Sequence, residues 1–481
     1  MAVPRILTLA LWCAAASAWA SPRTDPTTGR AVFTGATLPH ATSIELDPAA
    51  LGLGTFNQLY VALTGTLDQL HVDLDRLDGN RLVPGPRVRD VEMAPGAMLA
   101  FIYHLAGDSF TLGFDAHLAP PETFPSNPAL SYLVSGGSEQ DWQASAGVSY
   151  KATGDLFFGA SLSHQNTFLR LRYARDTALD SAQGPNLVPC NGAPCGIGNP
   201  AAAEGWNVDV RSPIFSTSNL RVNIGALYQV THDVWLAVAY HTPPGLGVES
   251  ELAGRATIDR APRDVAADPE LLPRICGPSV VPQICGQSVV DIQFPASVDA
   301  ELRARLPAQL DLHLAGRWED LSRMSTYDVR TYGTTLPSHG IPEWTERPRG
   351  MHDAFAFWGG VEQVDHGEQV RLGARLGFET SAVTPSRTSP LTVSPASATL
   401  DLGVQLRIAH GLIAQLSYGL QYFPKVNATG SEFDPRWRAD CTASDYDYST
   451  AACAAVRNGY AIATAAGTYD RIEHALRLGL R

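Results

Sequence analysis

Cysteine is the residue type in this chain whose number and spacing most clearly predict chemistry. Of seven cysteines, Cys13 lies near the start, and the others form three local pairs: Cys190 with Cys195, Cys276 with Cys285, and Cys441 with Cys453. Each pair encloses a short segment rich in Gly, Pro, Asn or Ala, as expected for disulfide-closed loops formed in an oxidising compartment. Metal binding is the alternative, but no pair has C-x-x-C spacing and no nearby histidine completes a tetrahedral set. We therefore predict three disulfides.

Histidine and acidic residues, the other candidates for catalysis or metal binding, show no recognisable spacing. The 13 histidines lie outside any H-E-x-x-H pattern, and no G-x-S-x-G segment is present. An acidic run over residues 434–447 lacks the spacing of a calcium loop and is typical of a solvated surface. The sequence predicts no metal site, no cofactor and no enzymatic activity. A Ser-His-Asp triad assembled by folding stays an open alternative, because triads are defined by geometry and not by chain order.

The first 20 residues have the features of a secretory signal peptide. Arg5 precedes a mostly apolar run over residues 6–16, and Ala18-Trp19-Ala20 forms an A-x-A cleavage site. A membrane anchor is the alternative, but it needs about 20 apolar residues, and the polar segment 21–30 ends this run. We predict cleavage before Ser21 and export from the cytoplasm.

Composition narrows the class of protein. Hydrophobic residues make up 45% of the chain and charged residues 17%, so the chain can bury an extensive core. After Ser21 no segment approaches the roughly 18 consecutive apolar residues of a membrane helix, which excludes a helical inner-membrane protein. The net charge of −13 argues against nucleic acid as a partner. A mean hydropathy near zero fits both a β-barrel with alternating faces and a soluble protein.

Apolar residues recur at every second position along much of the chain, which predicts β-strands. In one hairpin, apolar residues alternate over 97–105, the chain turns at 106–108, and alternation resumes over 110–118 with Thr111, Gly113, Asp115 and His117 between them. Similar hairpins are predicted over 142–173 and 220–240, with further turns near 307, 366 and 410. A first strand over 56–74, a polar connector over 75–91 and a last strand over 470–481 complete the pattern.

Fourteen such strands, six short turns and seven long connectors predict an all-β, 14-stranded antiparallel transmembrane barrel. The long connectors include 174–216, 251–287 and 424–467. Residues 21–55 have no strand alternation, so we expect them to fold into the lumen as a plug, with the barrel formed by residues 56–481. Such a barrel is expected in the outer membrane of a Gram-negative bacterium, in contact with outer-membrane lipid and as a monomer.

Aromatic residues near the strand ends predict interfacial girdles. The residues concerned are Tyr150 with Phe157 and Tyr228 with Trp235 around two short turns, and Tyr422 with Phe423 near the opposite interface. Packing inside the protein is the alternative explanation for these aromatics.

The N-terminal segment resembles the hatch of FadL-type long-chain fatty acid transporters. The similarity is carried by Gly29-Arg30-Ala31, the small residues 34–36, and Asp47-Pro48-Ala49 just before the first strand. In that family the hatch carries Gly-Arg-Ala early and Asn-Pro-Ala at its end. Asp47 replaces the Asn, and an aspartate can make the same side-chain-to-backbone turn bonds. The similarity extends over most of the mature chain at the level of topology, although Arg481 stands where such barrels commonly end in an aromatic residue.

This resemblance implies passive uptake of long-chain fatty acids or other hydrophobic compounds. The solute is captured among outer loops, passes the hatch and leaves through the barrel wall into the membrane; burial of about 25 cal/mol per Å² of apolar surface drives capture without chemistry. Apolar hatch residues that could contact ligand, or pack against the wall instead, are Phe33, Leu38, Ile44 and Leu46. Leu187, Val188 and Ile197 are the corresponding candidates in the loop capture groove.

Two other classes of function remain open from the sequence. A barrel enzyme such as a lipase or protease would need a Ser-His or Asp-His set, and mutation of one histidine would abolish hydrolysis. An adhesive or structural barrel would have a lumen filled by large polar side chains and would bind no apolar solute.

Overall fold

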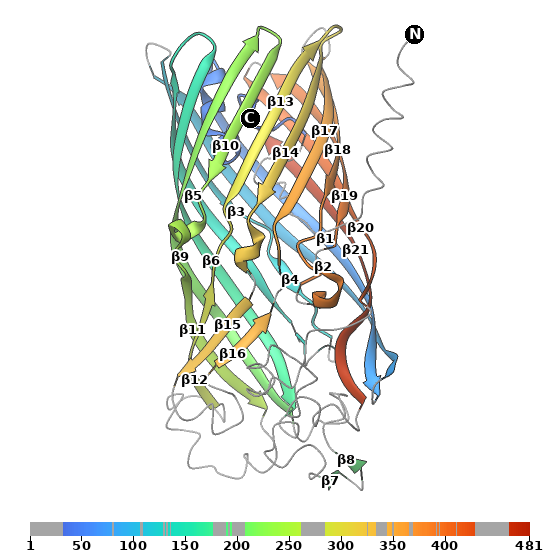
Figure 1. The fold of residues 1–481 in the computed structure, drawn as a ribbon. Helices are drawn as coiled ribbons and strands as arrows, with labels where there is room; N and C mark the ends of the chain where they lie inside the picture. Colours follow the sequence, from blue (N-terminus) through green and yellow to red (C-terminus); the bar gives the residue numbers. More distant parts are fainter. Residues whose placement is uncertain are drawn as a thin grey trace, which may run out of the picture.

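The strands form one closed antiparallel barrel of 14 strands (Figure 1). This computed structural model describes residues 32–481 apart from 79–80, 106–108, 128–129, 131–132, 135, 177–188, 191–192, 195–206, 261–283, 325, 333–343, 349–350, 365–368, 391, 394, 410 and 429–460. The last strand, β21 (Ala461–Leu480), pairs with the first, β1 (Gln58–Asp78), as predicted. Closure pairs the first strand with the last, so neither is left as a free edge in lipid, which cannot satisfy backbone polar groups.

Some strands run without interruption and others are broken once. The uninterrupted ones besides β1 and β21 are β2 (Arg81–His104), β5 (Gly137–Lys151), β6 (Leu156–Asp176), β9 (Asn207–Thr231), β18 (Val370–Glu379), β19 (Ser397–Ala409) and β20 (Leu412–Ala428). The broken ones are β3 (Phe110–Leu118) with β4 (Glu122–Phe124), β10 (Val234–His241) with β11 (Ser250–Arg260), β12 (Ile284–Ile292) with β13 (Ser297–Leu306), β14 (Leu310–Glu319) with β15 (Thr326–Tyr332), and β16 (Trp344–Pro348) with β17 (Ala354–Val364).

Short helices and one minor ladder complete the structure. They are α2 (Ser43–Leu46), η3 (Pro48–Leu53), η7 (Pro244–Gly247), η9 (Leu321–Met324), η10 (Pro385–Arg387), and the pair β7 (Pro189–Cys190) with β8 (Ala193–Pro194). Among the described residues, no helix is long and apolar enough to cross a membrane.

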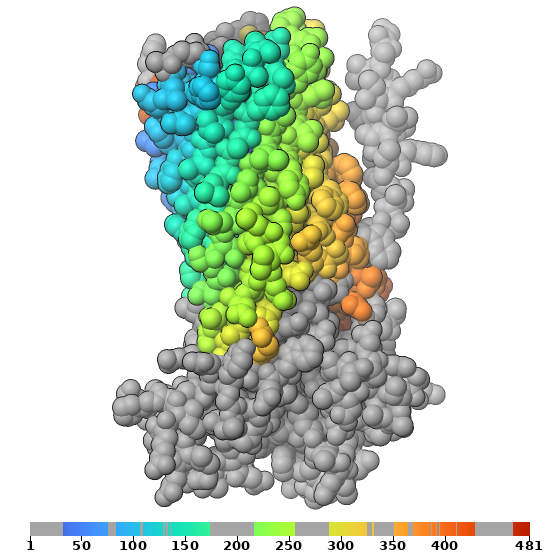
Figure 2. All heavy atoms as spheres, turned by 60° about the vertical axis from the view of Figure 1, so that its left-hand side comes forward, coloured from blue at the N-terminus to red at the C-terminus, as the bar shows by residue number. Residues whose placement is uncertain are grey.

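The outer surface of the barrel is apolar because alternate side chains of each strand point away from the lumen. In β3 the exposed residues are Phe110, Leu112 and Phe114, whereas Thr111, Asp115 and His117 are buried inside, which confirms the predicted alternation. The same arrangement recurs in the other long strands. Figure 2 shows the closely packed outer face of the barrel from one side. This face meets lipid, as in an outer-membrane barrel.

The predicted hairpin turns are confirmed, and all lie at one end of the barrel (Figure 1). They join β2 to β3, β5 to β6, β9 to β10, β13 to β14, β17 to β18, and β19 to β20. The connections at the other end are longer, with one exception. The predicted polar connector 75–91 is instead strand, because β1 and β2 stay paired as far as Asp78 and Arg81.

Other boundaries also moved toward longer strands. The two ends of the predicted connector 251–287 belong to strands: β11 extends to Arg260 and β12 begins at Ile284, and the two pair from Ser250 to Ile258. The last strand begins at Ala461 instead of 470. In each case backbone pairing with a neighbour extends the strand past the last clearly alternating residue, because ladder hydrogen bonds do not depend on side-chain polarity.

The predicted aromatic girdles are half wrong. Tyr150, Tyr228 and Tyr422 are exposed on the lipid face, but their assumed partners Phe157, Trp235 and Phe423 are buried in the lumen. Neighbouring residues of a strand point to opposite faces, so Phe423 cannot share the face of Tyr422. Across the turn after β5, it is Phe158 that pairs with Tyr150, and Phe157 pairs with Lys151.

Candidate functional site

The segment before β1 lies inside the barrel near the short turns, and we call residues 32–57 the hatch (Figure 1). Its two short helices meet at Asp47, whose side-chain Oδ1 accepts a hydrogen bond of 2.8 Å from the Ala49 N–H. Pro48 then starts η3, where its missing N–H costs nothing. This is the turn bond expected of Asp47 in the hatch motif. Gly29, Arg30 and Ala31 lie outside the described residues.

Glycines in the wall let the hatch backbone come close. A Cβ atom on Gly159 would overlap the backbone of Pro48 and Ala49, and one on Gly225 would overlap the Asp47 carboxylate. Gly113 and Gly147 leave room in the same way for Ile44 and Leu51. At Gly159 and Gly225, therefore, the hatch and the wall fit so closely that a larger residue would displace the hatch.

The four apolar hatch residues singled out by the sequence are all buried in this conformation. Ile44 lies against Gly113 and Gly147, and Leu46 belongs to an apolar cluster with Phe157 and Trp235. The other two, Phe33 and Leu38, are equally buried, with Phe33 placed against Gly373 and Gly403. Their contact with ligand stays a prediction.

Two buried carboxylates of the wall hold the start of the hatch. Glu301 on β13 accepts hydrogen bonds from the Ala36 N–H at 2.6 Å and the Thr37 hydroxyl at 2.7 Å. Glu362 on β17 accepts one from the Phe33 N–H at 2.8 Å and forms an ion pair with Arg371 at 2.6 Å. A void of about 10 Å³ beside Glu301 has room for one water at most.

Arg375 and His313 also contact the two carboxylates of this pair. Arg375 on β18 donates a hydrogen bond to the Thr34 carbonyl and lies 3.5 Å from Glu362. His313 on β14 bridges the two carboxylates, with its Nδ1 2.9 Å from Glu301 and its Nε2 3.7 Å from Glu362. The sequence analysis missed these residues, although charges at alternate positions of a strand, such as Asp299, Glu301 and Arg303, signal a polar lumen face.

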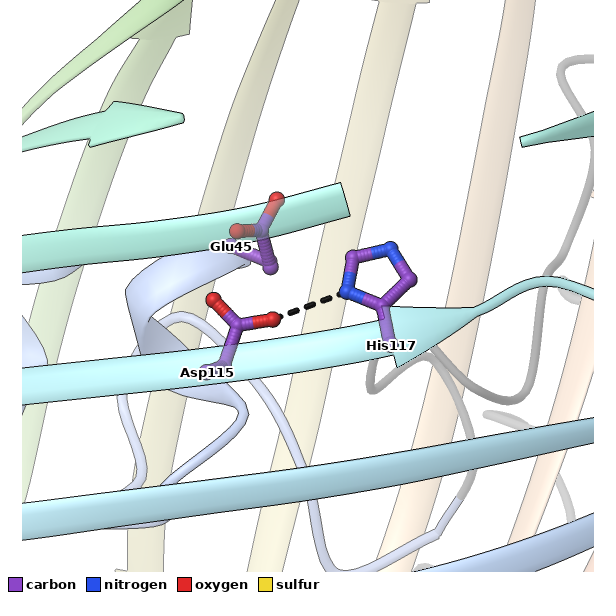
Figure 3. A group of neighbouring side chains, drawn as sticks. All are labelled: Glu45, Asp115 and His117. Carbon is purple, nitrogen blue, oxygen red and sulfur yellow. Dashed lines mark hydrogen bonds and ion pairs between the residues drawn. The ribbon is translucent and has the colours of Figure 1, made fainter. Parts of the chain in front are cut away.

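The opposite side of the hatch meets the wall through Glu45 of α2 (Figure 3). Its carboxylate accepts hydrogen bonds from Gln143 Nε2 at 2.6 Å and from the Ser145 hydroxyl. Asp115 and His117 of β3 point toward it, with His117 Nδ1 2.8 Å from Asp115 Oδ2. Burial raises the pKa of Glu45, and the neighbouring Asp115 charge raises it further.

One stretch of the wall lacks a continuous hydrogen-bonded ladder. The pairing of β2 with β3 ends at Ala97 and Leu118, and β4 pairs with β5 alone. Residues 81–96 of β2 pair with β1, so within the described chain their other edge has no strand partner. Between β3 and β4 the chain passes through Pro120 and Pro121, which have no N–H to donate to a ladder, and Pro120 lies against Gly96 of β2.

Beyond the hatch, toward the longer connections, the lumen contains both apolar clusters and buried polar groups such as Glu379 and Arg471. Two clusters of buried residues lie there: one includes Phe124, Leu169, Leu252, Ile292, Phe294 and Met324, and the other includes Leu70, Val72, Leu130, Leu133, Val393 and Tyr469. Both combine strand residues with residues of connecting segments. Apolar clusters therefore line part of the described lumen away from the hatch, on the side of the longer connections.

Most residues of the predicted loop capture groove and of the predicted disulfides lie outside the described part of the chain. Leu187, Val188, Ile197, Cys195, Cys276, Cys441 and Cys453 lie outside the described residues. For Cys190 and Cys285 only the backbone is described, in β7 and β12. The disulfides and the capture groove therefore stay predictions.

The chain is similar to known proteins in its fold but shares little sequence with them. No protein-family model matches the chain, and no curated protein matches it. In structure it is similar to a Pseudomonas aeruginosa FadL homologue, with a TM-score of 0.72, 13% identity, and coverage of 96% of this chain and 99% of that one. The Pseudomonas putida toluene transporter TodX gives a TM-score of 0.59 at 13% identity, covering 96% and 98%.

The Ralstonia pickettii toluene transporter TbuX is similar too, with a TM-score of 0.55, 15% identity, and coverage of 95% and 98%. The chain thus has the fold of FadL-type proteins over nearly its full length, including the hatch. A closed barrel of this kind with an apolar outer face belongs in the outer membrane of a Gram-negative bacterium.

Proposed function

We propose that this protein mediates passive uptake of long-chain fatty acids or other hydrophobic compounds across the outer membrane. One observation carries the proposal: two apolar clusters line the lumen toward the long connections, and a separate segment held largely through polar contacts closes the other end. A permanently sealed structural barrel needs neither an apolar entrance nor a closure of this type. No step of the proposed activity is enzymatic.

Capture is driven by burial of apolar surface. A solute that buries roughly 300 Å² of apolar area against the two clusters gains about 7 kcal/mol, enough for micromolar binding before the entropic cost of association is subtracted. Phe124, Leu169 and Phe294 are wall residues suited to this contact. Leu187, Val188 and Ile197, which lie outside the described residues, are proposed as further contacts for the solute.

Passage requires the hatch to move, since its apolar residues pack directly on the wall. Displacement of Ile44 and Leu46 exposes apolar surface to the solute, which replaces the wall contacts they lose. Because the main holding groups are hydrogen bonds from the hatch to Glu301 and Glu362, the closure is reversible without a covalent step. A bound solute favours whichever hatch position it contacts better.

Release is proposed to be lateral, where β2 has no partner beyond Ala97. Opening the wall elsewhere breaks ladder hydrogen bonds in lipid, each costing several kcal/mol. Between residues 81–96 of β2 and β4 that cost is already absent within the described chain. Glu45 of α2 lies beside the end of the β2–β3 ladder, so displacement of the hatch gives a hydrophobic solute access to this opening and to the membrane.

The test is a reversible lock on the hatch. Ile44→Cys with Gly147→Cys joins the two at a point where a Cβ on residue 147 lies 3.2 Å from the Ile44 side chain, within reach of a disulfide. Uptake of labelled oleate and labelled toluene is measured in cells lacking their own transporter. We expect the oxidised double variant to lose uptake and a reductant to restore it, whereas each single variant keeps uptake under both conditions.

Two results would contradict the proposal. Uptake that persists while the cross-link is complete on a gel shows that hatch movement is unnecessary. Absence of both oleate and toluene uptake by the correctly inserted wild type shows that these compounds are not carried, and leaves the enzyme and adhesin alternatives. A difference between oleate and toluene identifies the preferred class of solute.

A further inference from the structure

Glu45, Asp115 and His117 meet at the contact between the hatch and the wall, apart from the carboxylate pair that holds the start of the hatch (Figure 3). One ligand atom from each lies within 4.8 Å of the others, and all three residues are buried. Among the described residues this is the one such group of three. Spacing along the chain does not reveal it, since Glu45 comes from the hatch and the other two from alternate, inward-facing positions of β3.

The described residues satisfy neither all the hydrogen-bond acceptors of this group nor its negative charge by direct contact. Asp115 is 0% exposed, and within the described chain its Oδ1 has no hydrogen-bond partner. No arginine or lysine of the described residues forms a direct ion pair with Glu45 or Asp115, and Arg221 acts on Glu45 only through its charge at longer range. Two buried carboxylates with no cation in contact are costly unless they are neutralised, either by protons or by a bound cation.

The carboxylates at the start of the hatch provide an internal comparison. Glu362 is also completely buried, yet Arg371 lies 2.6 Å and Arg375 3.5 Å from it. There the barrel supplies its own counter-charges. Beside Glu45 and Asp115 it supplies an imidazole instead, which is a metal ligand when neutral.

We infer that Glu45, Asp115 and His117 form a binding site for a divalent metal ion of the zinc type, which fastens the hatch to β3. Two carboxylate oxygens and one imidazole nitrogen suit Zn²⁺, whereas Ca²⁺ and Mg²⁺ prefer oxygen ligands alone. Two negative charges match the charge of the ion. A fourth position is left for water or for a nearby side chain.

The geometry requires only small movements. Zinc bonds to nitrogen and oxygen are about 2.0–2.2 Å long, so two ligand atoms of one tetrahedral ion lie roughly 3.4 Å apart. The present separations, up to 4.8 Å, close by rotation of the carboxylates. His117 binds through Nδ1 as the tautomer whose proton is on Nε2, so no net proton is lost from a neutral ring.

The hydrogen bonds already made by Glu45 orient it for this role. Gln143 and Ser145 each donate to its carboxylate, whose two oxygens together accept about four hydrogen bonds or ligands. Both donors can therefore stay in place as outer partners of a metal ligand. The three ligands connect α2 to the strand whose ladder with β2 ends at Leu118, one residue beyond His117.

The test uses purified full-length protein without a polyhistidine tag, stripped with chelator and titrated with Zn²⁺. Zinc per chain is measured by mass spectrometry and affinity by calorimetry for wild type, Glu45→Gln, Asp115→Asn and His117→Gln. His71→Gln is the matched control, because His71 Nδ1 also lies 2.9 Å from an aspartate, Asp470, at a half-exposed position. We expect one zinc fewer in each site variant, or a loss of affinity beyond the roughly 10–100-fold typical of outer partners.

A second measurement covers variants that fold poorly. X-ray absorption of the zinc-loaded wild type is expected to give nitrogen and oxygen neighbours with one imidazole, and zinc is expected to slow hydrogen exchange of hatch amides in wild type and the control only. Equal zinc binding by wild type and His117→Gln, or sulfur neighbours indicating cysteine ligands, overturns the inference. These measurements need no uptake, so their failure leaves the proposed transport untouched.

Discussion

Glutamine in place of Glu301 should loosen the hatch by a predictable amount. Both oxygens of this carboxylate accept from the hatch, one from the Ala36 N–H at 2.6 Å and one from the Thr37 hydroxyl at 2.7 Å. An amide has one accepting oxygen, so its NH₂ group must face one of these donors. If the NH₂ group faces the Ala36 N–H, two donors point at each other and no hydrogen bond forms. If it faces Thr37, the threonine hydroxyl can keep a hydrogen bond only by turning to accept one.

The cost follows from ordinary hydrogen-bond energies. A hydrogen bond to a charged group contributes about 1.5–3 kcal/mol, and the Glu301→Gln change loses one of these and weakens the other. Water from the lumen replaces part of the loss, so we take about 2 kcal/mol as the net effect. At 1.4 kcal/mol per factor of ten, this shifts the equilibrium between seated and released hatch by roughly 30-fold.

Hydrogen exchange of the purified protein measures this shift directly. We expect amides of residues 32–57 that exchange by hatch release to do so roughly 30-fold faster, while the strand amides keep their rates. Glu473→Gln is the control, a lumen glutamate that lies 3.5 Å from Arg471 and faces another part of the wall. Unchanged hatch exchange in Glu301→Gln refutes the argument that this carboxylate holds the hatch.

Three further outcomes are expected. Gly159→Ala pushes a methyl group into the backbone of Pro48 and Ala49, so it should lower the melting temperature or speed hatch exchange by an amount equivalent to about 1–3 kcal/mol, whereas Gly154→Ala, with open space around it, should do neither. His40 is buried against Tyr60, at 4.5 Å between rings, with no partner for Nε2 among the described residues; burial lowers its pKa, and Arg481, Arg477 and Arg371 lower it further. When the hatch is released, the pKa of His40 returns to near 6.5, so the released hatch takes up a proton at a higher pH than the seated hatch does. The seated hatch should therefore be equally favoured at all pH values above about 6.5 and become less favoured as the pH falls below it. His40→Gln should flatten that part of a plot of hatch exchange against pH. Leu169→Asn with Leu252→Asn, placed in the apolar cluster, should reduce oleate uptake with the barrel intact on a heat-modifiability gel, and unchanged uptake would show that this cluster is not on the path.

The alternation of apolar and polar residues along the strands is sufficient to predict the hairpins and the two faces of each strand. Alternation in 97–118 identified a hairpin, its turn and its two faces, because the requirement of lipid on one side and lumen on the other is local to each strand. The same logic failed for the girdles around Phe157 and Trp235. Which face a residue takes after a turn depends on the number of residues in the turn and on its geometry. The alternation within each strand does not reveal this, so the faces of Phe157 and Trp235 were predicted wrongly.

The hatch contacts show a different limit. Glu301, Glu362 and Glu45 each touch a segment far from them in sequence, Glu362 being 329 residues from Phe33. No periodicity links such positions, because they become neighbours only when the barrel closes around the hatch. The break after Leu118 was hidden for the same reason, as a ladder needs both strands to be placed.

The sequence by itself determined the class of this protein: the period-two alternation, the unequal connections and the hatch motif predict a 14-stranded barrel with an internal plug. Local chemistry is sufficient for this, since each strand must satisfy lipid on one face and each turn must reverse the chain. Only the tertiary structure decided which carboxylates hold the hatch, where the wall loses its ladder, and that Glu45, Asp115 and His117 converge. These depend on closure of the barrel, which sets distances between residues that no local rule connects.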